Sequence, residues 1–165
     1  MNTANYSFLY NDELTVLELR RLYESCGFKK FSMSKFESYD FYARNKDFLV
    51  SKSIITFSDL NGKLMALKPD VTLSIVKNAD RNEKRQKLYY TENVYRESKE
   101  IHEIKEIFQV GLEVLGDIDL YESFEIVSLA VKSLLTIDQA SFFTQPSRLT
   151  NLVTLCYTAS LIQAF

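Results

Sequence analysis

The chain has 165 residues, of which 46% are hydrophobic and 25% charged, and its formal net charge is −2 at pH 7. This length suits one domain with a substantial core, and the charge balance is that of an ordinary globular protein and not of a nucleic-acid binder. No apolar run approaches the roughly 20 residues that cross a bilayer, and the N-terminus lacks the pattern of a secretory signal, so we expect a cytoplasmic protein without membrane contact.

The cysteines and the histidine do not form a recognisable metal or disulfide pattern. Cys26 and Cys156 have no CxxC spacing and no Cys/His neighbour, and His102 is the single histidine. We therefore expect reduced cysteines, no metal site and no cofactor. His102 lies on a charged loop without a Ser, Cys or carboxylate fixed beside it by local spacing, and we interpret it as an exposed residue and not as a general base or pH sensor.

The first half of the chain predicts a helix followed by short strands. Residues 12–26 carry apolar side chains at helical spacing, Asn11 or Asp12 can cap the start, and Gly27 suits the end. The other elements expected here are a strand at 28–32, a short helix or extended segment at 36–42, and a hairpin of strands at 54–58 and 63–67 around the Asn61-Gly62 turn.

The segment LKPDVT follows this hairpin at residues 67–72. Pro69 disfavours helix at the residue before it, and Asp70 or Thr72 can cap a helix over residues 73–79. From the sequence pattern alone, Asp70 is more simply a cap than a ligand-binding group.

Residues 87–116 predict two strands joined by a charged loop. In the second strand Gln109 and Glu113 fall at period two among apolar residues, so they share one face of the sheet. A helix over residues 117–135, with Asp117 as its cap, completes an α+β architecture in which an antiparallel sheet is flanked by helices. Its helical stripe consists of Leu120, Phe124, Val127, Val131 and Leu134, with Leu135 beside it.

Several of these segments together resemble a known family. LKPDVT, the triplet Tyr95-Arg96-Glu97 and the run FQVGLEVLG at 108–116 look like the catalytic-domain core of histidyl-tRNA synthetase and of its paralogue, the regulatory subunit of ATP phosphoribosyltransferase. The Gly-Phe pair at 27–28 and the aromatic-acidic pairs at 36–40 resemble the first class II synthetase motif. The resemblance implies a class II synthetase-like antiparallel sheet flanked by helices.

By motif matching, the resemblance also implies a pocket for histidine or a similar amino acid. Asp70 and Thr72 match the positions that hold the ligand's ammonium group, which needs such acceptors when it is partly buried. Gln109 and Glu113 match the other amino-acid-pocket positions. Arg96 matches the second-motif arginine, whose planar charged fork suits the α-phosphate of ATP or the amino-acid carboxylate. The implied site contains no catalytic residue.

Departures from the synthetase pattern favour the regulatory paralogue. The active enzymes carry arginines in the loop after the second-motif arginine, where this chain carries glutamates. A polyphosphate would meet repulsion of about 1 kcal/mol or more from each unscreened like charge, so we expect no adenylation. Lys68 replaces an arginine, which weakens a bidentate contact, and Met33-Ser34 replaces the Thr-Pro of the first motif at the usual dimer contact. The loop glutamates, interpreted as solvated charge, are Glu97, Glu100, Glu103 and Glu106.

The resemblance ends near residue 135. We divide the chain into a synthetase-like domain at 1–138 and a divergent apolar tail at 139–165. Family members continue with a Gly- and Arg-rich third motif that this sequence does not show, so we expect an incomplete fold. A fragment, a naturally shortened paralogue and a reading-frame change all remain open.

One hypothesis and two alternatives follow. We expect a non-catalytic subunit that resembles the regulatory subunit of ATP phosphoribosyltransferase, associates with the catalytic subunit of that enzyme and senses histidine as an effector in histidine biosynthesis. We also expect it to associate with itself. The first alternative is a catalytic fragment of histidyl-tRNA synthetase acting on histidine and ATP. The second is a structural dimerisation module, which the apolar residues 149–165 would favour.

Overall fold

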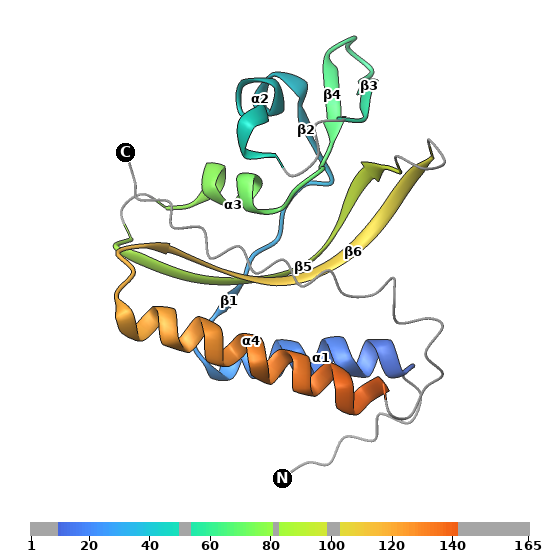
Figure 1. Cartoon of the computed structure of the whole chain (residues 1–165). Helices are drawn as coiled ribbons and strands as arrows, with labels where there is room; N and C mark the ends of the chain where they lie inside the picture. The colour runs from blue at the N-terminus through green and yellow to red at the C-terminus, as the bar shows by residue number, and fades with distance from the viewer. Residues whose placement is uncertain (1–9, 50–53, 81–82, 99–102, 142–165) are drawn as a thin grey trace.

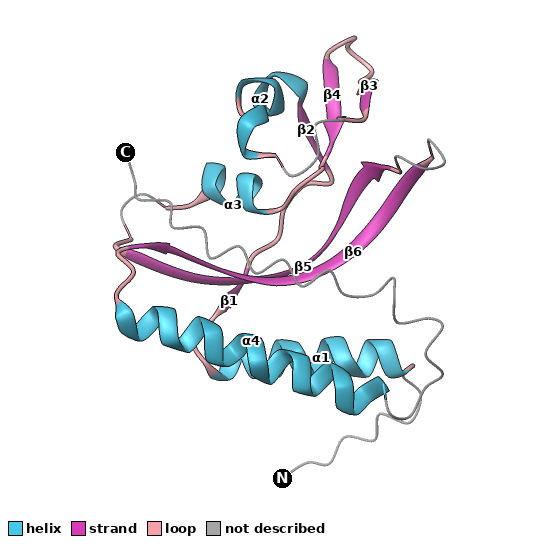
Figure 2. Cartoon of the chain, viewed as in Figure 1, coloured by secondary structure: helices cyan, strands magenta, loops and turns pink. Residues whose placement is uncertain are grey.

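The computed structural model describes residues 10–49, 54–80, 83–98 and 103–141, and its elements follow the predicted order. Cys156, His102 and nearly all of the tail predicted at 139–165 lie outside the described residues, so the predicted domain division stays a prediction. The structure confirms an α+β chain with helices flanking an antiparallel strand pair (Figure 2). The elements are α1 (Asn11–Ser25), β1 (Lys29–Lys30), β2 (Phe36–Ser38), α2 (Tyr39–Arg44), the 3-10 helix η1 (Lys46–Phe48), β3 (Thr56–Ser58), β4 (Leu64–Leu67), α3 (Thr72–Asn78), β5 (Arg85–Glu97), β6 (Ile104–Gly116) and α4 (Leu120–Ser141).

The larger sheet has the strand order β1-β5-β6. Strands β5 and β6 pair antiparallel over thirteen residue pairs, from Arg85 opposite Gly116 to Glu97 opposite Ile104. Strand β1 runs parallel to β5, with Lys29 opposite Leu88, so the sheet is not wholly antiparallel as the sequence predicted. A long connection joins β1 to β5, and a parallel neighbour requires such a crossover in place of a tight hairpin.

A second, smaller sheet has the order β2-β4-β3 and confirms the predicted hairpin. Its turn contains Gly62 at φ +78°, a left-handed conformation that glycine adopts at little cost. The segment predicted as helix or extended contains both, because β2 pairs with β4 and the chain then turns into α2. This small sheet therefore holds the start of the LKPDVT segment, whose Leu67 ends β4.

Helix α1 ends as the sequence predicts but begins differently. Gly27 has φ +82°, and the backbone amides of Gly27 and Phe28 donate to the carbonyls of Glu24 and Tyr23, at 3.0 and 3.1 Å. These two bonds form a Schellman motif, which satisfies carbonyls at the helix end. The N-cap is Tyr10 and not Asn11 or Asp12, and its own backbone amide donates to the Glu13 carboxylate at 2.9 Å.

The β5–β6 pair has different neighbours on its two faces (Figure 1). Helices α1 and α4 lie side by side on one face, and α3, α2 and the small sheet lie on the other. The hydroxyls of Tyr23 on α1 and Ser133 on α4 are 3.0 Å apart and join the helices at a buried point. The core between the helices and the sheet consists of Leu19, Tyr23, Phe28, Tyr89, Val110, Leu112, Val114 and Leu129.

Helix α3 has a different N-cap from the one predicted. It is Val71, although the Asp70 carboxylate still accepts a hydrogen bond from the Leu73 amide at 3.2 Å. Asp70 therefore satisfies one of the free amides of the first helical turn without occupying the cap position.

Helix α4 begins slightly later than predicted. The amides of Tyr121 and Glu122 donate to the Asp119 carboxylate at 2.7 and 3.2 Å, so Asp119 and not Asp117 caps the helix. The difference arises because the two aspartates lie close together before the helix, and sequence alone does not fix such a boundary to the residue.

The apolar stripe predicted for α4 points away from the sheet. Phe124 is 69% exposed and Val131 53%, whereas Leu129 is 1% exposed and belongs to the core. Helix α4 is thus apolar on two sides, and its period identified a helix without showing which side is buried. Among the described residues, no helix combines the length and apolar character of a membrane span.

The orientation of α4 predicts a large loss of stability for one leucine-to-alanine substitution in this helix and a small loss for another. Leu129→Ala should lower the free energy of unfolding by about 2 to 5 kcal/mol, because it leaves a cavity in the core. Leu134→Ala removes a side chain that is 54% exposed and should change it by well under half as much. Chemical denaturation in dilute protein measures both, and equal losses would contradict the orientation of α4.

Candidate functional site

The face of β5–β6 toward α3 carries the polar residues predicted for the site. In the antiparallel register Leu88 lies opposite Glu113 and Glu92 opposite Gln109, and directly opposed residues share a face. Apolar neighbours on this face, including Leu88 and Val94, pack against Val71 and Ile75 of the α3 region. The sheet therefore buries Gln109 and Glu113, each only 1% exposed, on a face that also carries these apolar side chains.

Backbone and side-chain contacts tie the LKPDVT segment to the end of β5. The Tyr95 amide donates to the Lys68 carbonyl at 2.9 Å, and Nε of Arg96 donates to the Pro69 carbonyl at 3.0 Å. Pro69 lacks an amide donor, and its carbonyl is the group that fixes the arginine. These contacts bring Asp70 beside Arg96.

Asp70 and Arg96 form a loose ion pair. Oδ2 of Asp70 lies 4.0 Å from Nη2 of Arg96, which is longer than a hydrogen bond. That Nη2 atom is buried and has no hydrogen-bond partner in the structure. Burial raises the pKa of the Asp70 carboxyl, while the Leu73 amide and the Arg96 charge lower it, so burial has the larger effect. The pair presents an acceptor and a donor whose hydrogen-bonding capacity is not used up.

Thr72 and Glu113 form a second contact on the same face. Oγ1 of Thr72 donates to Oε1 of Glu113 at 2.6 Å, across 41 residues of sequence. A buried carboxylate needs such donors, because its charge is costly to remove from water. The threonine at the start of α3 thereby holds the side chain from β6 in place.

The structure brings four of the five predicted site residues into two contacting pairs. Asp70 meets Arg96, and Thr72 meets Glu113, while Gln109 lies between the two pairs along β6. Gln109 and Glu113 lie four residues apart on β6, so they share one face of the sheet with Arg96. Asp70 and Thr72 contact this face from the start of α3. Their binding role is not thereby tested and stays a prediction.

The sequence did not identify the buried ion pair at this site. Nζ of Lys68, which is 0% exposed, lies 2.7 Å from Oε2 of Glu92, the residue directly opposite Gln109. Burial lowers the pKa of the Lys68 ammonium, and the hydrogen bond and charge of Glu92 counteract it. The available signal was a glutamate at an inward period-two position between the apolar Tyr90 and Val94.

Tyr90 and Gly111 fill the space between the polar residues. Gly111 lies opposite Tyr90, and a Cβ added there would come within 2.3 Å of the Tyr90 hydroxyl oxygen. The tyrosine side chain therefore extends across β6 at a position where only glycine leaves room for it. It separates the parts of this face that carry Gln109 and Glu113.

The described glutamates of the charged loop, Glu97, Glu103 and Glu106, are exposed, as their interpretation as solvated charge predicts, and Glu106 also forms hydrogen bonds. The Glu106 carboxylate accepts hydrogen bonds from the Asn93 amide nitrogen at 2.6 Å and the Tyr95 hydroxyl at 2.9 Å. The hydrogen bond between Tyr95 and Glu106 is the largest cause of the raised pKa of the Tyr95 hydroxyl. Glu106 therefore forms these hydrogen bonds on the other face of the sheet from Arg96. Lys105 is the residue of β6 that pairs with Arg96. Glu100 lies outside the described residues.

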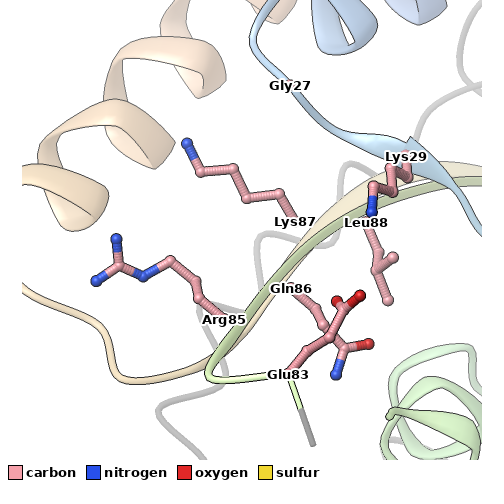
Figure 3. Close-up of a pocket in the computed structure, with 7 residues that line it drawn as sticks. All are labelled: Gly27, Lys29, Glu83, Arg85, Gln86, Lys87 and Leu88. Atoms are coloured by element: carbon pink, nitrogen blue, oxygen red, sulfur yellow. The ribbon is translucent and has the colours of Figure 1, made fainter.

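A depression of about 260 Å³ lies elsewhere, where β1 meets the other end of β5 (Figure 3). Figure 3 shows Arg85 and Lys87 pointing toward α4. Arg85 pairs there with Glu122, and Lys87 with Glu125 at 2.5 Å, so these cations are neutralised within the chain. We do not assign a function to this depression. It is lined by Gly27, Lys29, Glu83, Arg85, Gln86, Lys87 and Leu88.

Comparisons with known proteins agree on one family. The family model described as histidyl-tRNA synthetase matches residues 10–157. Histidine–tRNA ligase of Methanocaldococcus jannaschii is 30% identical over 125 residues, which cover 73% of this chain and 30% of the ligase. The ATP phosphoribosyltransferase regulatory subunit of Clostridium acetobutylicum is 30% identical over 129 residues, or 75% of this chain and 32% of the subunit. The chain thus spans about a third of the length of these relatives.

A solved structure shares the fold. The ATP phosphoribosyltransferase HisG:HisZ complex from Thermotoga maritima contains a chain that matches with a TM-score of 0.58 and 22% identity. The match covers 88% of this chain and 44% of that one. At this identity the likeness establishes the fold alone.

The buried Lys68–Glu92 pair predicts a large and pH-dependent loss of stability. Glu92→Gln leaves a fully buried ammonium without its counterion and should lower the free energy of unfolding by about 3 to 5 kcal/mol at pH 7. The folded-state pKa of Lys68 is below 10.5, so the folded protein releases the Lys68 proton more readily and is favoured as pH rises toward 10.5. The deficit of the variant should therefore shrink as pH is raised.

The matched control is Glu37→Gln. Glu37 pairs with Lys77 at 2.6 Å, but the lysine side chain is 39% exposed, so the loss should be about 1 kcal/mol or less. Denaturation of both variants between pH 7 and 10 makes the comparison. Equal, pH-independent losses would contradict a buried ammonium at position 68.

Proposed function

The chain belongs to the histidyl-tRNA synthetase family, and from this premise we propose that it is a non-catalytic regulatory subunit of ATP phosphoribosyltransferase that binds histidine. Relatives named as synthetases and as regulatory subunits match this chain at about the same identity, so their names alone do not choose between the two roles. The choice depends on the groups that the chain places around the predicted site.

The loose Asp70–Arg96 pair is the observation that most supports this proposal. An amino acid is a zwitterion, whose ammonium needs an anionic acceptor and whose carboxylate needs a cationic donor. Asp70 is 7% exposed, and the buried Nη2 of Arg96 has a donor capacity that the 4.0 Å contact with Asp70 does not use. Such a pair can open to accept a zwitterion with one charged group on each partner.

The remaining site residues supply polar groups for the ligand's side chain. An imidazole has one nitrogen that donates and one that accepts, and Gln109 and Glu113 offer an amide and a carboxylate on the same face, one on each side of Tyr90. The apolar residues around them exclude water and strengthen each polar contact. These features support histidine as the ligand class.

The charged end of the β5–β6 pair supports recognition without adenylation. The described residues at this end of the pair include the acidic Glu97 and Glu103, and the Ser98 amide donates to the Glu103 carbonyl at 2.8 Å. Carboxylates near a triphosphate repel it. In the regulatory role, histidine would change activity through a difference in its affinity for two states of the complex with the catalytic subunit.

Titration calorimetry of the full chain with L-histidine tests the ligand. Asp70→Asn removes the carboxylate, so the dissociation constant should rise about tenfold or more, the loss expected for a hydrogen bond to a charged group. Asp117→Asn makes the same chemical change at an exposed position at the other end of β5–β6 and should leave binding unchanged. Folded protein that binds no histidine, alone or with the catalytic subunit, would overturn the proposal.

Although Asp70→Asn should weaken histidine binding, it should raise the thermal stability of the ligand-free chain at pH 7. The folded-state pKa of Asp70 lies above its ordinary value of 3.8, so the stability that Asp70 contributes is full below that value and is lost as pH rises through the raised pKa. Asparagine has no such loss. Without ligand, the thermal midpoint of Asp70→Asn should exceed that of the parent at pH 7, and the difference should shrink near pH 4, the ordinary range of aspartate.

A catalytic synthetase fragment is the second candidate, and one contact favours it. Lys105 lies directly across from Arg96 and adds a cation where a phosphate would bind. Histidine-dependent exchange of pyrophosphate into ATP discriminates between the two roles. The regulatory proposal predicts no exchange above background, and exchange that Arg96→Ala abolishes would establish the synthetase role in its place.

A further inference from the structure

Three alternate residues of the LKPDVT segment each contact a polar side chain of the larger sheet. In chain order these contacts are Lys68–Glu92, Asp70–Arg96 and Thr72–Glu113. The two outer contacts are 2.7 and 2.6 Å long, whereas the middle contact is 4.0 Å long. The outer contacts are therefore hydrogen bonds, and the middle contact, which is the proposed amino-acid site, is not.

Both the backbone and the side chain of Lys68 are bonded to neighbouring segments. Its amide donates to the Lys35 carbonyl at 3.0 Å, and its carbonyl accepts from the Tyr95 amide at 2.9 Å. Its Nζ atom donates to the Glu92 carboxylate at 2.7 Å, and the lysine side chain is 0% exposed. Because a hydrogen bond is stronger away from water, this buried ion pair is a firm attachment. Residue 68 is therefore fixed against β5, two residues before Asp70.

The contacts are spaced differently along β5 and along the LKPDVT segment. Glu92 and Arg96 are four residues apart in β5, a separation of about 13 Å at roughly 3.3 Å per residue. Lys68 and Asp70 are two residues apart, so their Cα atoms are separated by at most about 7 Å. The side chains have to span a difference of about 6 Å. A short Lys68–Glu92 contact therefore leaves the Asp70–Arg96 contact long.

A closed Asp70–Arg96 ion pair would use both groups that a zwitterion needs. A charge-assisted hydrogen bond is about 2.7 to 2.9 Å long, so closure of the 4.0 Å contact takes a movement of roughly 1 Å. The closed pair does not bind the ligand until it opens, and its population lowers the apparent affinity in proportion. A device that keeps the pair open thus favours binding.

We propose that the buried Lys68–Glu92 pair is this device, and that it positions Asp70 so that the Asp70–Arg96 pair stays open for the amino acid. Lys68 and Glu92 are then positioning residues, which act on binding without touching the ligand. The inference rests on the proposed function for its ligand. The separation of Asp70 from Arg96 can nevertheless be followed in the ligand-free chain.

A double variant of the full chain, Lys68→Met with Glu92→Gln, tests the positioning role. It removes the contact without leaving a buried charge unpaired. Burial raises the pKa of Asp70 in the parent, and closure on Arg96 should lower that pKa, because a cation at hydrogen-bond distance favours the carboxylate. Carboxyl ¹³C nuclear magnetic resonance without ligand follows the titration, and Asp70→Asn assigns the signal. The dissociation constant of L-histidine, from calorimetry, should rise about tenfold if one molecule in ten stays open.

Glu92→Asp is a milder second variant, which keeps the charge and shortens the side chain by one methylene. It loosens the contact with Lys68 and should lower the pKa of Asp70 in the same direction by a smaller amount. It provides the same readout if the double variant does not fold, as judged by circular dichroism.

The matched control is Lys77→Met with Glu37→Gln. It removes another Lys–Glu pair, 2.6 Å long, whose lysine side chain is 39% exposed. The pKa of Asp70 and the histidine affinity should stay at their parental values. A parental pKa of Asp70 in the folded double variant, or in Glu92→Asp where the double variant is unfolded, overturns the positioning role. A parent chain that binds no histidine overturns the proposed function instead, while a lowered pKa of Asp70 would still support the positioning role.

Discussion

The register of the β5–β6 pair determines which side chains lie on each face of the larger sheet. Thirteen opposed pairs fix which side chains face α1 and α4 and which face α3. A slip by one residue would exchange Gln109 and Glu113 for Val110 and Val114. The helix face would then bury the Gln109 amide and the Glu113 carboxylate against Leu19 and Leu129, and the α3 face would lose both polar groups. The apolar core and the polar site thus depend on the same alternation of side chains between the two faces of β5 and β6.

The polar face is maintained by pairing and not by solvent. Lys68 is fully buried but forms an ion pair with Glu92, and Glu113 accepts a hydrogen bond from Thr72. Replacing such groups by well-packed apolar residues costs little in many proteins, whereas removing one partner costs much. The Asp70–Arg96 pair differs because its atoms are 4.0 Å apart and burial still raises the pKa of Asp70. A ligand that binds only the folded chain stabilises it, so the proposed amino acid should raise the stability of this site.

Local patterns predicted the elements better than the contacts between them. Period two placed Gln109 and Glu113 on one face, and Gly27 marked the end of α1, because both are decided by neighbouring residues. The proximity of Asp70 to Arg96 was available only from the family resemblance, since the two residues lie on either side of α3 and far apart in sequence. The Lys68–Glu92 pair was missed for the same reason. For α4 the period was correct, but the helix carries two apolar sides, and only the packed structure shows that Leu129 and not Phe124 faces the core.

We propose that Asp70 and Arg96 together receive an amino acid, and nuclear magnetic resonance of the ¹⁵N-labelled chain can observe both residues during a titration. The Leu73 amide, which donates to Asp70, and Nε–H of Arg96, which donates to the Pro69 carbonyl, are separate reporters of the two partners. Titration with L-histidine should shift both signals and leave the Tyr121 amide, bonded to Asp119 across the molecule, unchanged. Shifts confined to Lys29 and Lys87 at the other depression, or none at Leu73 and Arg96, would contradict the account.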